Sequence, residues 1–236
     1  MNVSKEQIQS IVSDVLKKYM SESSGGRQSA PYVPPVGTSG IFPTIADAVE
    51  AAYVSQKQFV RLSLETRANI IEAMRRTALS NVRELAEMAV AETGMGRVED
   101  KIIKKTIVAK KTPGLEDLNP IALTGDGGLT LIEQGPFGLI GSITPSTNPA
   151  ATVINNSISM IAAGNGVVFN FHPAAKKVSQ QALRLMNEAI CSAGGPANLL
   201  VTVEEPTMQS GLDLMTHPKI RLLVVCLLYT SPSPRD

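Results

Sequence analysis

The sequence predicts an α/β fold in which a helical N-terminal region is followed by a parallel sheet of the Rossmann type. Two observations predict it. Apolar residues recur at helical spacing from residue 44 to about residue 111. From Phe137 onward, short apolar runs alternate with helical segments, which is the pattern of right-handed βαβ units and a parallel sheet. With 236 residues, of which 43% are hydrophobic, the chain can form a core of one or two domains.

The composition excludes several classes of protein. The net charge of +1 provides no electrostatic footprint for nucleic acid. No apolar run approaches the ~20 residues of a membrane span, and the N-terminus lacks a secretory signal. The two cysteines form neither a disulfide framework nor a metal-binding pattern. These observations predict a cytoplasmic protein with no nucleic-acid partner, no membrane partner and no metal.

The first segment, residues 1–20, predicts an amphipathic helix. Ser4 and Gln7 have the spacing of a capping box. Residues 21–40 are rich in Ser, Gly and Pro and predict a flexible linker. A helix on such a tether needs a partner for its apolar stripe, either another protein or the rest of its own chain or oligomer. A membrane surface is disfavoured because acidic residues offset its lysines. The stripe consists of Ile8, Ile11, Val12, Val15, Leu16, Tyr19 and Met20.

Three helices are predicted next. Thr44 caps the first, whose predicted buried face includes Tyr53. The second runs from about Leu64 to Glu92, before two glycines that suit a helix end. The third, Val98 to Lys111, has a basic side that is typical of a solvated helix face. The lysines of that side are Lys101, Lys104, Lys105, Lys110 and Lys111.

The remaining segments predict a turn and then the parallel sheet. Gly125–Gly128 suits a tight turn, and Leu129–Gln134 alternates as a strand. The predicted parallel strands are Phe137–Ile143, Gly166–Asn170, Leu199–Val203 and Ile220–Val225, and the predicted helices between them are Ala150–Ala163, Ala174–Ala193 and about Thr207–Met215.

The ends of these strands are the candidate site. Pro145 and Pro149 cannot continue a sheet ladder, and Asn148 suits the N-cap of the helix that follows. Open parallel sheets bind ligands beyond the carboxyl ends of their strands. The usual Gly-x-Gly-x-x-Gly fingerprint is absent. Spacing alone therefore predicts only a nucleotide-sized crevice.

Three segments carry a resemblance to a known family. They are Ile143-Thr-Pro-Ser-Thr-Asn-Pro149, Phe169-Asn-Phe-His-Pro-Ala-Ala-Lys-Lys177 and Gly194-Gly-Pro-Ala-Asn-Leu-Leu-Val-Thr-Val-Glu-Glu-Pro-Thr207. Together they resemble the coenzyme A-acylating branch of the aldehyde dehydrogenase superfamily, over residues 41–225. Within that branch, the chain is similar to the bacterial microcompartment enzymes of ethanolamine and propanediol utilisation. Phe171 departs from the family pattern, which usually has proline there.

The resemblance implies that the strand ends bind NAD. The implied cofactor-binding residues are Thr144, Pro145, Ser146 and Asn148 after the first strand, Asn170, His172, Pro173 and Ala175 after the second, and Glu205, Pro206 and Thr207 after the third.

Two of these residues have alternative interpretations. Many relatives have lysine at the position of His172, and imidazole offers less positive charge for a 2′-phosphate, which favours NAD over NADP. A histidine before proline could equally be a structural cap. Asn148 is a candidate oxyanion donor in catalysis. It is otherwise a plain N-cap, since Thr147 stands where other relatives place that asparagine.

The resemblance also implies an activity: oxidation of a short aldehyde by NAD, with coenzyme A as co-substrate. The family uses a cysteine thiolate in a second, catalytic domain. Cys191 is expected to be a buried structural residue, and Cys226 falls in residues 226–236, which resemble a translated sequencing adapter. The alternative for that tail is a natural Ser/Pro-rich segment. We therefore expect an inactive N-terminal part of the enzyme, with an incomplete NAD-binding domain in residues 41–225.

The resemblance finally implies partners. Residues 1–20 would be an encapsulation peptide that docks on a shell protein inside a bacterial microcompartment, and the full enzyme would be a homo-oligomer. Two other functions stay open: a non-catalytic nucleotide-binding or shell-docking module, and an acyl-phosphate reductase of the same superfamily.

Overall fold

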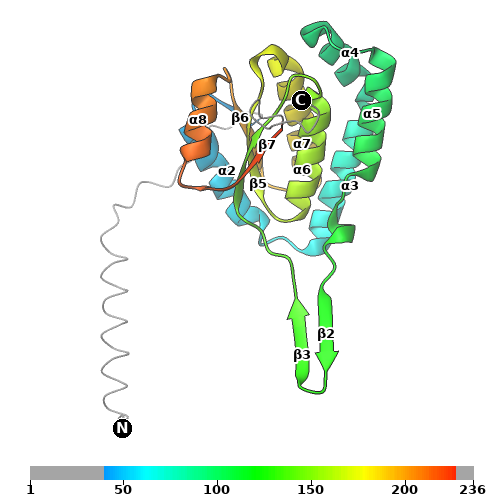
Figure 1. Ribbon diagram of the computed structural model, residues 1–236, viewed down its shortest axis with the longest axis vertical. Helices are drawn as coiled ribbons and strands as arrows, with labels where there is room; N and C mark the ends of the chain where they lie inside the picture. Colours follow the sequence, from blue (N-terminus) through cyan, green and yellow to red (C-terminus); the bar gives the residue numbers. More distant parts are fainter. Residues whose placement is uncertain (1–39, 227–236) are drawn as a thin grey trace, which may run out of the picture. The chain divides into compact units, whose positions relative to one another are not determined.

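The computed structural model describes residues 40–226. The predicted helix at residues 1–20, nearly all of the linker and the tail from residue 227 lie outside the described residues. Within them, a parallel sheet is flanked by helices on both faces, which confirms the α/β prediction (Figure 1). None of the helices in residues 40–226 is both long and apolar enough to cross a bilayer.

The sheet has five strands, and all neighbouring strands run parallel. Their order across the sheet is β1 (Ile41–Phe42), β6 (Leu200–Val203), β5 (Gly166–Asn170), β4 (Leu139–Ile143) and β7 (Ile220–Val225). The central strand β5 is buried along its whole length, as its continuous apolar run predicts. Because all strands are parallel, their carboxyl ends meet at one edge, where the candidate site residues follow.

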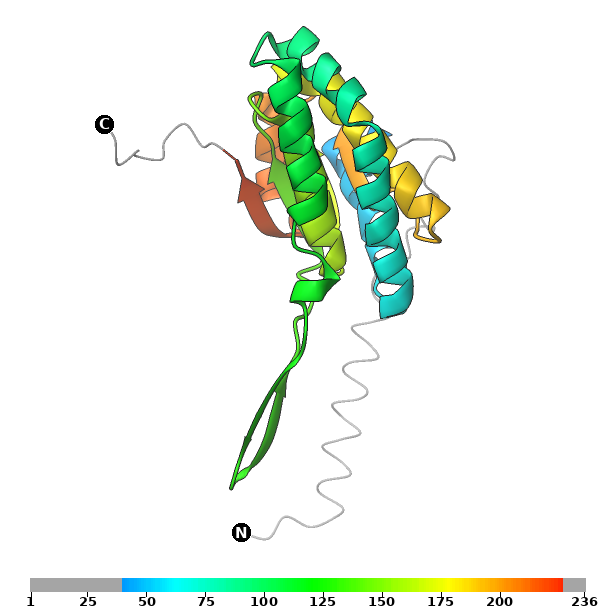
Figure 2. The same cartoon turned by 90° about the vertical axis from the view of Figure 1, so that its right-hand side faces the viewer.

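The helices form layers on the two faces of the sheet (Figures 1 and 2). One face is covered by α2 (Ile45–Phe59) and α8 (Met208–Thr216), and the other by α6 (Pro149–Ala162) and α7 (Lys176–Ser192). Outside α6 and α7 lie α3 (Leu64–Ser80), α4 (Val82–Thr93) and α5 (Val98–Lys111). A large core forms between the sheet and the layer of α6 and α7, and continues between these two helices and α3. Short 3-10 turns stand at Leu115–Asp117 and Pro173–Ala175.

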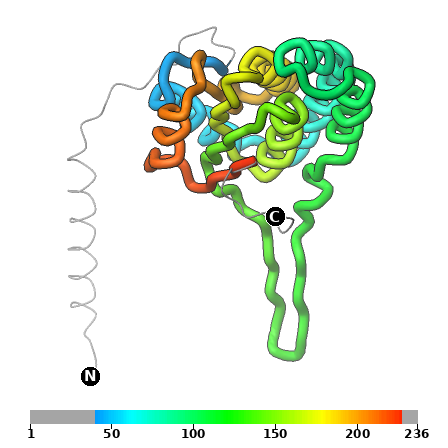
Figure 3. The backbone as a smooth tube through the Cα atoms, turned by 45° about the horizontal axis from the view of Figure 1, so that its top comes forward, coloured from blue at the N-terminus to red at the C-terminus, as the bar shows by residue number. Residues whose placement is uncertain are grey.

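An antiparallel hairpin leaves the layered body between α5 and β4 (Figure 3). It consists of β2 (Ile121–Gly125) and β3 (Gly128–Ile132), joined at the predicted tight turn. Every residue of both strands is exposed, including several leucines and isoleucines. The sequence prediction contained the turn and the second strand only.

The predicted second helix is wrong in one respect, because the structure breaks it at Asn81. The Asn81 side-chain amide donates to the Thr77 carbonyl at 2.8 Å, and its backbone N–H donates to the Ala78 carbonyl at 3.3 Å. Asparagine competes in this way with the regular helical pattern. The chain consequently turns into α4, which ends at Gly94 in the left-handed conformation, as predicted.

Three further sequence predictions are corrected by burial and backbone geometry. Tyr53 is 36% exposed rather than core, and the ammonium groups of Lys57 and Lys219 lie 5.3 and 4.5 Å from its ring centre. The strand predicted from Phe137 begins at Leu139, because Gly138 has a φ of 114°. The two-residue strand β1 was not predicted, since only its pairing with β6 defines it.

The N-terminus of α7 is closed by a carboxylate from another helix. Glu92 of α4 accepts hydrogen bonds from the backbone N–H groups of Lys177 and Val178, both at 2.7 Å. These are first-turn N–H groups that have no partner inside the helix, and the helix dipole favours a negative charge there. The Glu92 carboxylate therefore occupies the position at this helix end where an anion could otherwise bind. It also links α4 to α7, which packs on the sheet.

We expect Glu92→Ala to lower the free energy of unfolding by about 1–2 kcal/mol, the usual cost of losing a helix cap. Urea unfolding followed by circular dichroism measures it. Glu87→Ala is the matched control on the same helix: its carboxylate lies 3.7 Å from Arg83 with both side chains exposed, so its loss should cost well under ~1 kcal/mol. Equal effects of the two variants would contradict the capping role.

Candidate functional site

The turn between β4 and α6 begins the candidate site. Its first residue, Thr144, continues the sheet by donating its backbone N–H to the Asn170 carbonyl at 3.2 Å. The Thr144 side chain is buried, and its hydroxyl oxygen has no hydrogen-bond partner among the described residues. A buried hydroxyl without a partner is costly and therefore uncommon. It is the kind of group that a bound ligand would satisfy.

The loop after β5 forms the second wall. Both polar atoms of the Asn170 side chain already have a partner within the protein: its amide nitrogen donates to the Thr207 carbonyl at 3.2 Å, and its oxygen accepts from the Ser210 hydroxyl at 2.7 Å. Phe171, which the family pattern does not predict, is buried and stacks on Phe169 with ring centres 5.5 Å apart. The substitution thus adds to the core.

His172 caps the short 3-10 turn at Pro173–Ala175, which confirms the interpretation of this histidine as a structural cap. Its Nδ1 accepts a hydrogen bond from the Ala174 backbone N–H at 3.1 Å. An accepting Nδ1 leaves the proton of a neutral imidazole on Nε2, so the outer side of the exposed ring is a donor. The capping role and a ligand contact are therefore compatible.

The loop after β6 contributes fewer residues to the candidate site than the sequence predicted. Thr207 caps α8 in a reciprocal capping box with Ser210. Glu205 is mostly exposed and pairs with Lys176 at 2.6 Å, and Pro206 is buried. Of this predicted set, only Thr207 lines the cavity described next.

These loops and α8 enclose a cavity of about 280 Å³. Five predicted residues line it: Thr144, Asn170, His172, Pro173 and Thr207. Sequence reasoning missed the rest of the lining, which is Ile143, Phe171, Met208, Gly211, Leu212 and Met215. The signal that could have found the α8 wall is the apolar character of Met208, Leu212 and Met215, which are 89%, 53% and 37% exposed on a short helix after the third strand.

The other predicted residues lie elsewhere. Ala175 is fully buried under α7, and Pro145 and Ser146 line neither this cavity nor the next. Asn148 stands at the N-cap position of α6 but forms no capping hydrogen bond. Its side-chain oxygen instead accepts from the Lys104 ammonium at 2.9 Å. The predicted N-cap position is confirmed, but the predicted capping hydrogen bond is absent, and the oxygen that would form it is bonded to a lysine of α5.

A second cavity, also of about 280 Å³, lies where Thr147 and Asn148 face the start of α5. It is lined in addition by Met95, Gly96, Arg97, Asp100, Lys101 and Lys104. It shares no residue with the first cavity. The structure therefore divides the predicted site between two places.

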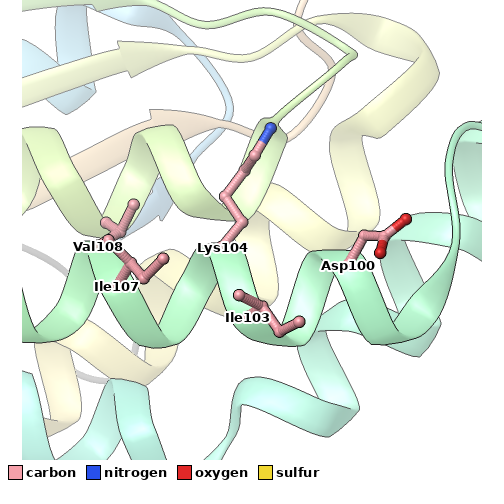
Figure 4. A pocket seen from close by; sticks show the side chains of 5 residues that line it. All are labelled: Asp100, Ile103, Lys104, Ile107 and Val108. Carbon is pink, nitrogen blue, oxygen red and sulfur yellow. The ribbon is translucent and has the colours of Figure 1, made fainter.

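The basic side of α5 is only in part the solvated face that the charge run predicts, because Lys104, Lys110 and Lys111 are exposed but two other lysines are not. Lys101 and Lys105 are 8% and 3% exposed, whereas Ile103 and Ile107 are 59% and 56% exposed. Figure 4 shows these isoleucines with Asp100, Lys104 and Val108 around a surface cavity of about 320 Å³, and Lys104 extends from the helix toward the chain that enters α6. The helix thus turns two lysines inward and two isoleucines outward.

Burial sets the acid–base properties of these lysines. It lowers the pKa of Lys105 to about 8, and the charges of Lys101 and Lys104 act in the same direction. The pKa of Lys101 is also lowered, first by burial and then by Lys104. The residue types alone predict ordinary surface lysines, because it is the packing of α5 against α3, α4 and α6 that removes Lys101 and Lys105 from water.

Cys191 is exposed, not buried as the sequence predicts. Partial desolvation of its sulfur and the nearby Glu188 raise the pKa of the thiol. A raised pKa keeps the sulfur protonated and weakly nucleophilic at neutral pH. In this respect the structure agrees with the prediction that Cys191 is not a nucleophile.

Comparison with known proteins identifies relatives of this structure. The model of the aldehyde dehydrogenase family matches residues 43–226. The acetylating acetaldehyde dehydrogenase EutE of Escherichia coli (strain K12) is 50% identical over 223 residues, which are 94% of this chain and 46% of that protein. The chain therefore spans about half the length of this relative.

Solved structures of related enzymes resemble this chain in fold and in sequence. An engineered glycolyl-CoA reductase with bound NADP+ has a TM-score of 0.79 and 46% identity, and the match covers 80% of this chain and 44% of that one. A propionaldehyde dehydrogenase from the fucose utilisation microcompartment of Clostridium phytofermentans has a TM-score of 0.77 and 49% identity, with 79% of this chain and 43% of that chain covered.

Proposed function

Because the chain belongs to the aldehyde dehydrogenase family, we propose that the cavity between β4, β5 and α8 binds the adenosine part of a nicotinamide dinucleotide. Its volume of about 280 Å³ suits one part of the cofactor rather than the whole. The observation that carries the proposal is the buried, unpartnered hydroxyl of Thr144 in the wall of this cavity. The Nε2–H of His172 is a second polar group for a ribose.

We propose NAD as the cofactor, with NADP as the alternative. Among the described residues, His172 is the only basic side chain in the lining of the cavity, and the neighbouring Lys176 is already paired with Glu205. A 2′-phosphate would require a positive charge to offset its own. NADP remains the alternative because the related glycolyl-CoA reductase was solved with NADP+.

The proposed activity is the coenzyme A-acylating oxidation of a short aldehyde such as acetaldehyde or propionaldehyde. Its support is the similarity to the acetylating acetaldehyde dehydrogenase and to the microcompartment propionaldehyde dehydrogenase. The bound nicotinamide would accept the hydride. In this proposal the described residues hold the cofactor, and neither Cys191 nor Cys226 is the nucleophile. Asn148 stays a candidate oxyanion donor, since its side-chain N–H groups are not used by the bond to Lys104.

We also propose that residues 1–20 dock on a microcompartment shell protein. The support is the amphipathic sequence pattern together with the microcompartment origin of one related structure. Co-sedimentation with purified shell protein tests this: deletion of residues 1–20 should abolish it. Retained binding after the deletion would contradict the proposal.

Thr144→Val tests the cofactor site through two effects of opposite sign. Removing an unsatisfied buried hydroxyl should raise the stability of the ligand-free chain by about 1 kcal/mol. The same change should weaken NAD binding by roughly tenfold, because the ligand loses one hydrogen bond. Thermal unfolding measures the first effect, and isothermal titration with NAD and NADP measures the second.

Ser157→Ala is the matched control. The Ser157 hydroxyl is also buried without a partner, but it lies in α6 and lines neither cavity. Its loss should stabilise the chain and leave NAD binding unchanged. If the native chain binds neither NAD nor NADP, the cofactor proposal fails. Tighter binding of NADP than of NAD would reverse the cofactor preference.

A further inference from the structure

Three neighbouring lysines of α5 have no acidic partner among the described residues. In the part of the chain from residue 40 to 226, the ion pairs involve other residues, and Lys101, Lys104 and Lys105 form none. Burial of an ammonium group is costly unless an opposite charge compensates it. Lys101 and Lys105 are nevertheless almost completely buried. The protein thus holds positive charges close together with nothing to offset them.

Two of these lysines, Lys101 and Lys104, line the second cavity. Within residues 40–226, the only acidic residue that lines it is Asp100, whose two carboxylate oxygens accept hydrogen bonds from the Arg97 guanidinium at 2.8 and 3.1 Å. Asp100 therefore neutralises Arg97 and leaves both lysine charges in excess. The cavity of about 280 Å³ is large enough for a small anion.

Hydrogen-bond donors remain available around this cavity. Each ammonium group has three N–H donors. Lys101 uses one toward the Thr147 carbonyl at 3.2 Å, and Lys104 uses one toward the Asn148 side chain at 2.9 Å. The first turn of α5 adds backbone N–H groups, because Arg97 at the N-cap position provides no side-chain cap.

We propose that this cavity binds a phosphate group, either as the free ion or as a phosphate ester. A carboxylate is best recognised by the planar fork of an arginine, and the fork of Arg97 is occupied by Asp100. Two separate ammonium groups, each with several donors, suit a tetrahedral anion with more than one negative charge. Because the two cavities share no residue, this site is separate from the proposed dinucleotide cavity.

Chemical-shift titrations of the 236-residue chain by nuclear magnetic resonance test the proposal. Inorganic phosphate, ethyl phosphate and acetate are added separately at constant ionic strength. We expect both phosphates to shift the amide signals of residues 96–101, 147 and 148 saturably, and acetate to bind at least tenfold more weakly. Saturation by inorganic phosphate alone would assign the site to the free ion, and tighter binding of ethyl phosphate would assign it to an ester.

Lys104→Met provides the decisive variant, because Lys104 is exposed at the helix surface and its loss should leave the fold intact. It should weaken phosphate binding by about tenfold, the loss of one charge-assisted contact. Lys110→Met, at the exposed end of the same helix, should leave binding unchanged. Saturating NAD should not displace the phosphate. The proposal is overturned by unsaturable shifts, by unchanged affinity in Lys104→Met, by displacement with NAD, or by acetate binding as tightly as phosphate.

Discussion

Lys105→Met is expected to raise the free energy of unfolding by about 2–3 kcal/mol at pH 7. Lys105 is 3% exposed, forms no ion pair, and has its pKa lowered from 10.5 to about 8, mainly by burial. A pKa difference of this size corresponds to roughly 3 kcal/mol of unfavourable interaction of the charged form. Methionine keeps the apolar stem and removes the charge, so the penalty disappears.

The gain should depend on pH in a defined direction. Below about pH 8 the lysine is protonated in both the folded and the unfolded chain, and the penalty is fully present. Between about pH 8 and the unfolded value of 10.5, the unfolded chain binds more protons than the folded chain, so the stability of the native chain rises with pH. The advantage of Lys105→Met should therefore shrink across this window.

Urea unfolding of both chains between pH 7 and pH 10.5 measures this difference, and subtraction removes the titration of other groups that the two chains share. Lys110→Met is the control, because Lys110 is exposed on the same helix. Its effect should stay within about 0.5 kcal/mol and should not vary with pH. If Lys105→Met destabilises the chain, the Lys105 charge must have a stabilising partner, and the burial argument is wrong.

Gly40→Ala is expected to lower the free energy of unfolding by more than about 3 kcal/mol. Gly40 has a φ of 81°, which an L-residue adopts at a cost. A Cβ there would collide with the Leu200 carbonyl oxygen and the Asn187 side chain, and would lie 2.8 Å from the Leu183 Cδ2. The Gly40 carbonyl also accepts the first bond between β1 and β6, from the Thr202 N–H at 2.8 Å. Overpacking and strain therefore act at the same residue.

Gly94→Ala separates strain from overpacking. Gly94 has a φ of 67°, but an added Cβ would meet no atom within 4 Å. Its cost should be about 1 kcal/mol, the backbone term alone. Thermal and urea unfolding of the two variants measure the difference. Similar losses for Gly40→Ala and Gly94→Ala would show that the edge of the sheet at β1 tolerates an added methyl group.

Much of the fold could be predicted from residues that act locally. The bounds of β5 and β7 follow from short apolar runs, and the start of α2 follows from Thr44, whose side chain accepts from the Asp47 N–H. The helix predicted at Ala174–Ala193, which the structure has as α7 (Lys176–Ser192), and the parallel direction of the strands follow from the same alternation. These features depend on neighbours in the sequence, so their signals are present in it.

The candidate site was predictable only in part. Thr144 and His172 follow strands whose ends must meet, and both line one cavity. Whether a polar side chain there is free or already bonded depends on distant partners. Asn170 is occupied by Thr207 and Ser210, and Asn148 by Lys104, which none of the motifs indicates.

The sequence by itself determined the parallel sheet and the turn after β4, because hydrophobic periodicity and prolines express these directly. The family followed from the resemblance of three segments. Only the tertiary structure decided the state of the lysines on α5. A run of lysines on a helix is the same pattern whether its face is exposed or buried, and the packing of α5 against α3, α4 and α6 removed Lys101 and Lys105 from water. Desolvation and the absence of a nearby acid are properties of the folded arrangement, and they turn an ordinary basic helix into the wall of a proposed phosphate site.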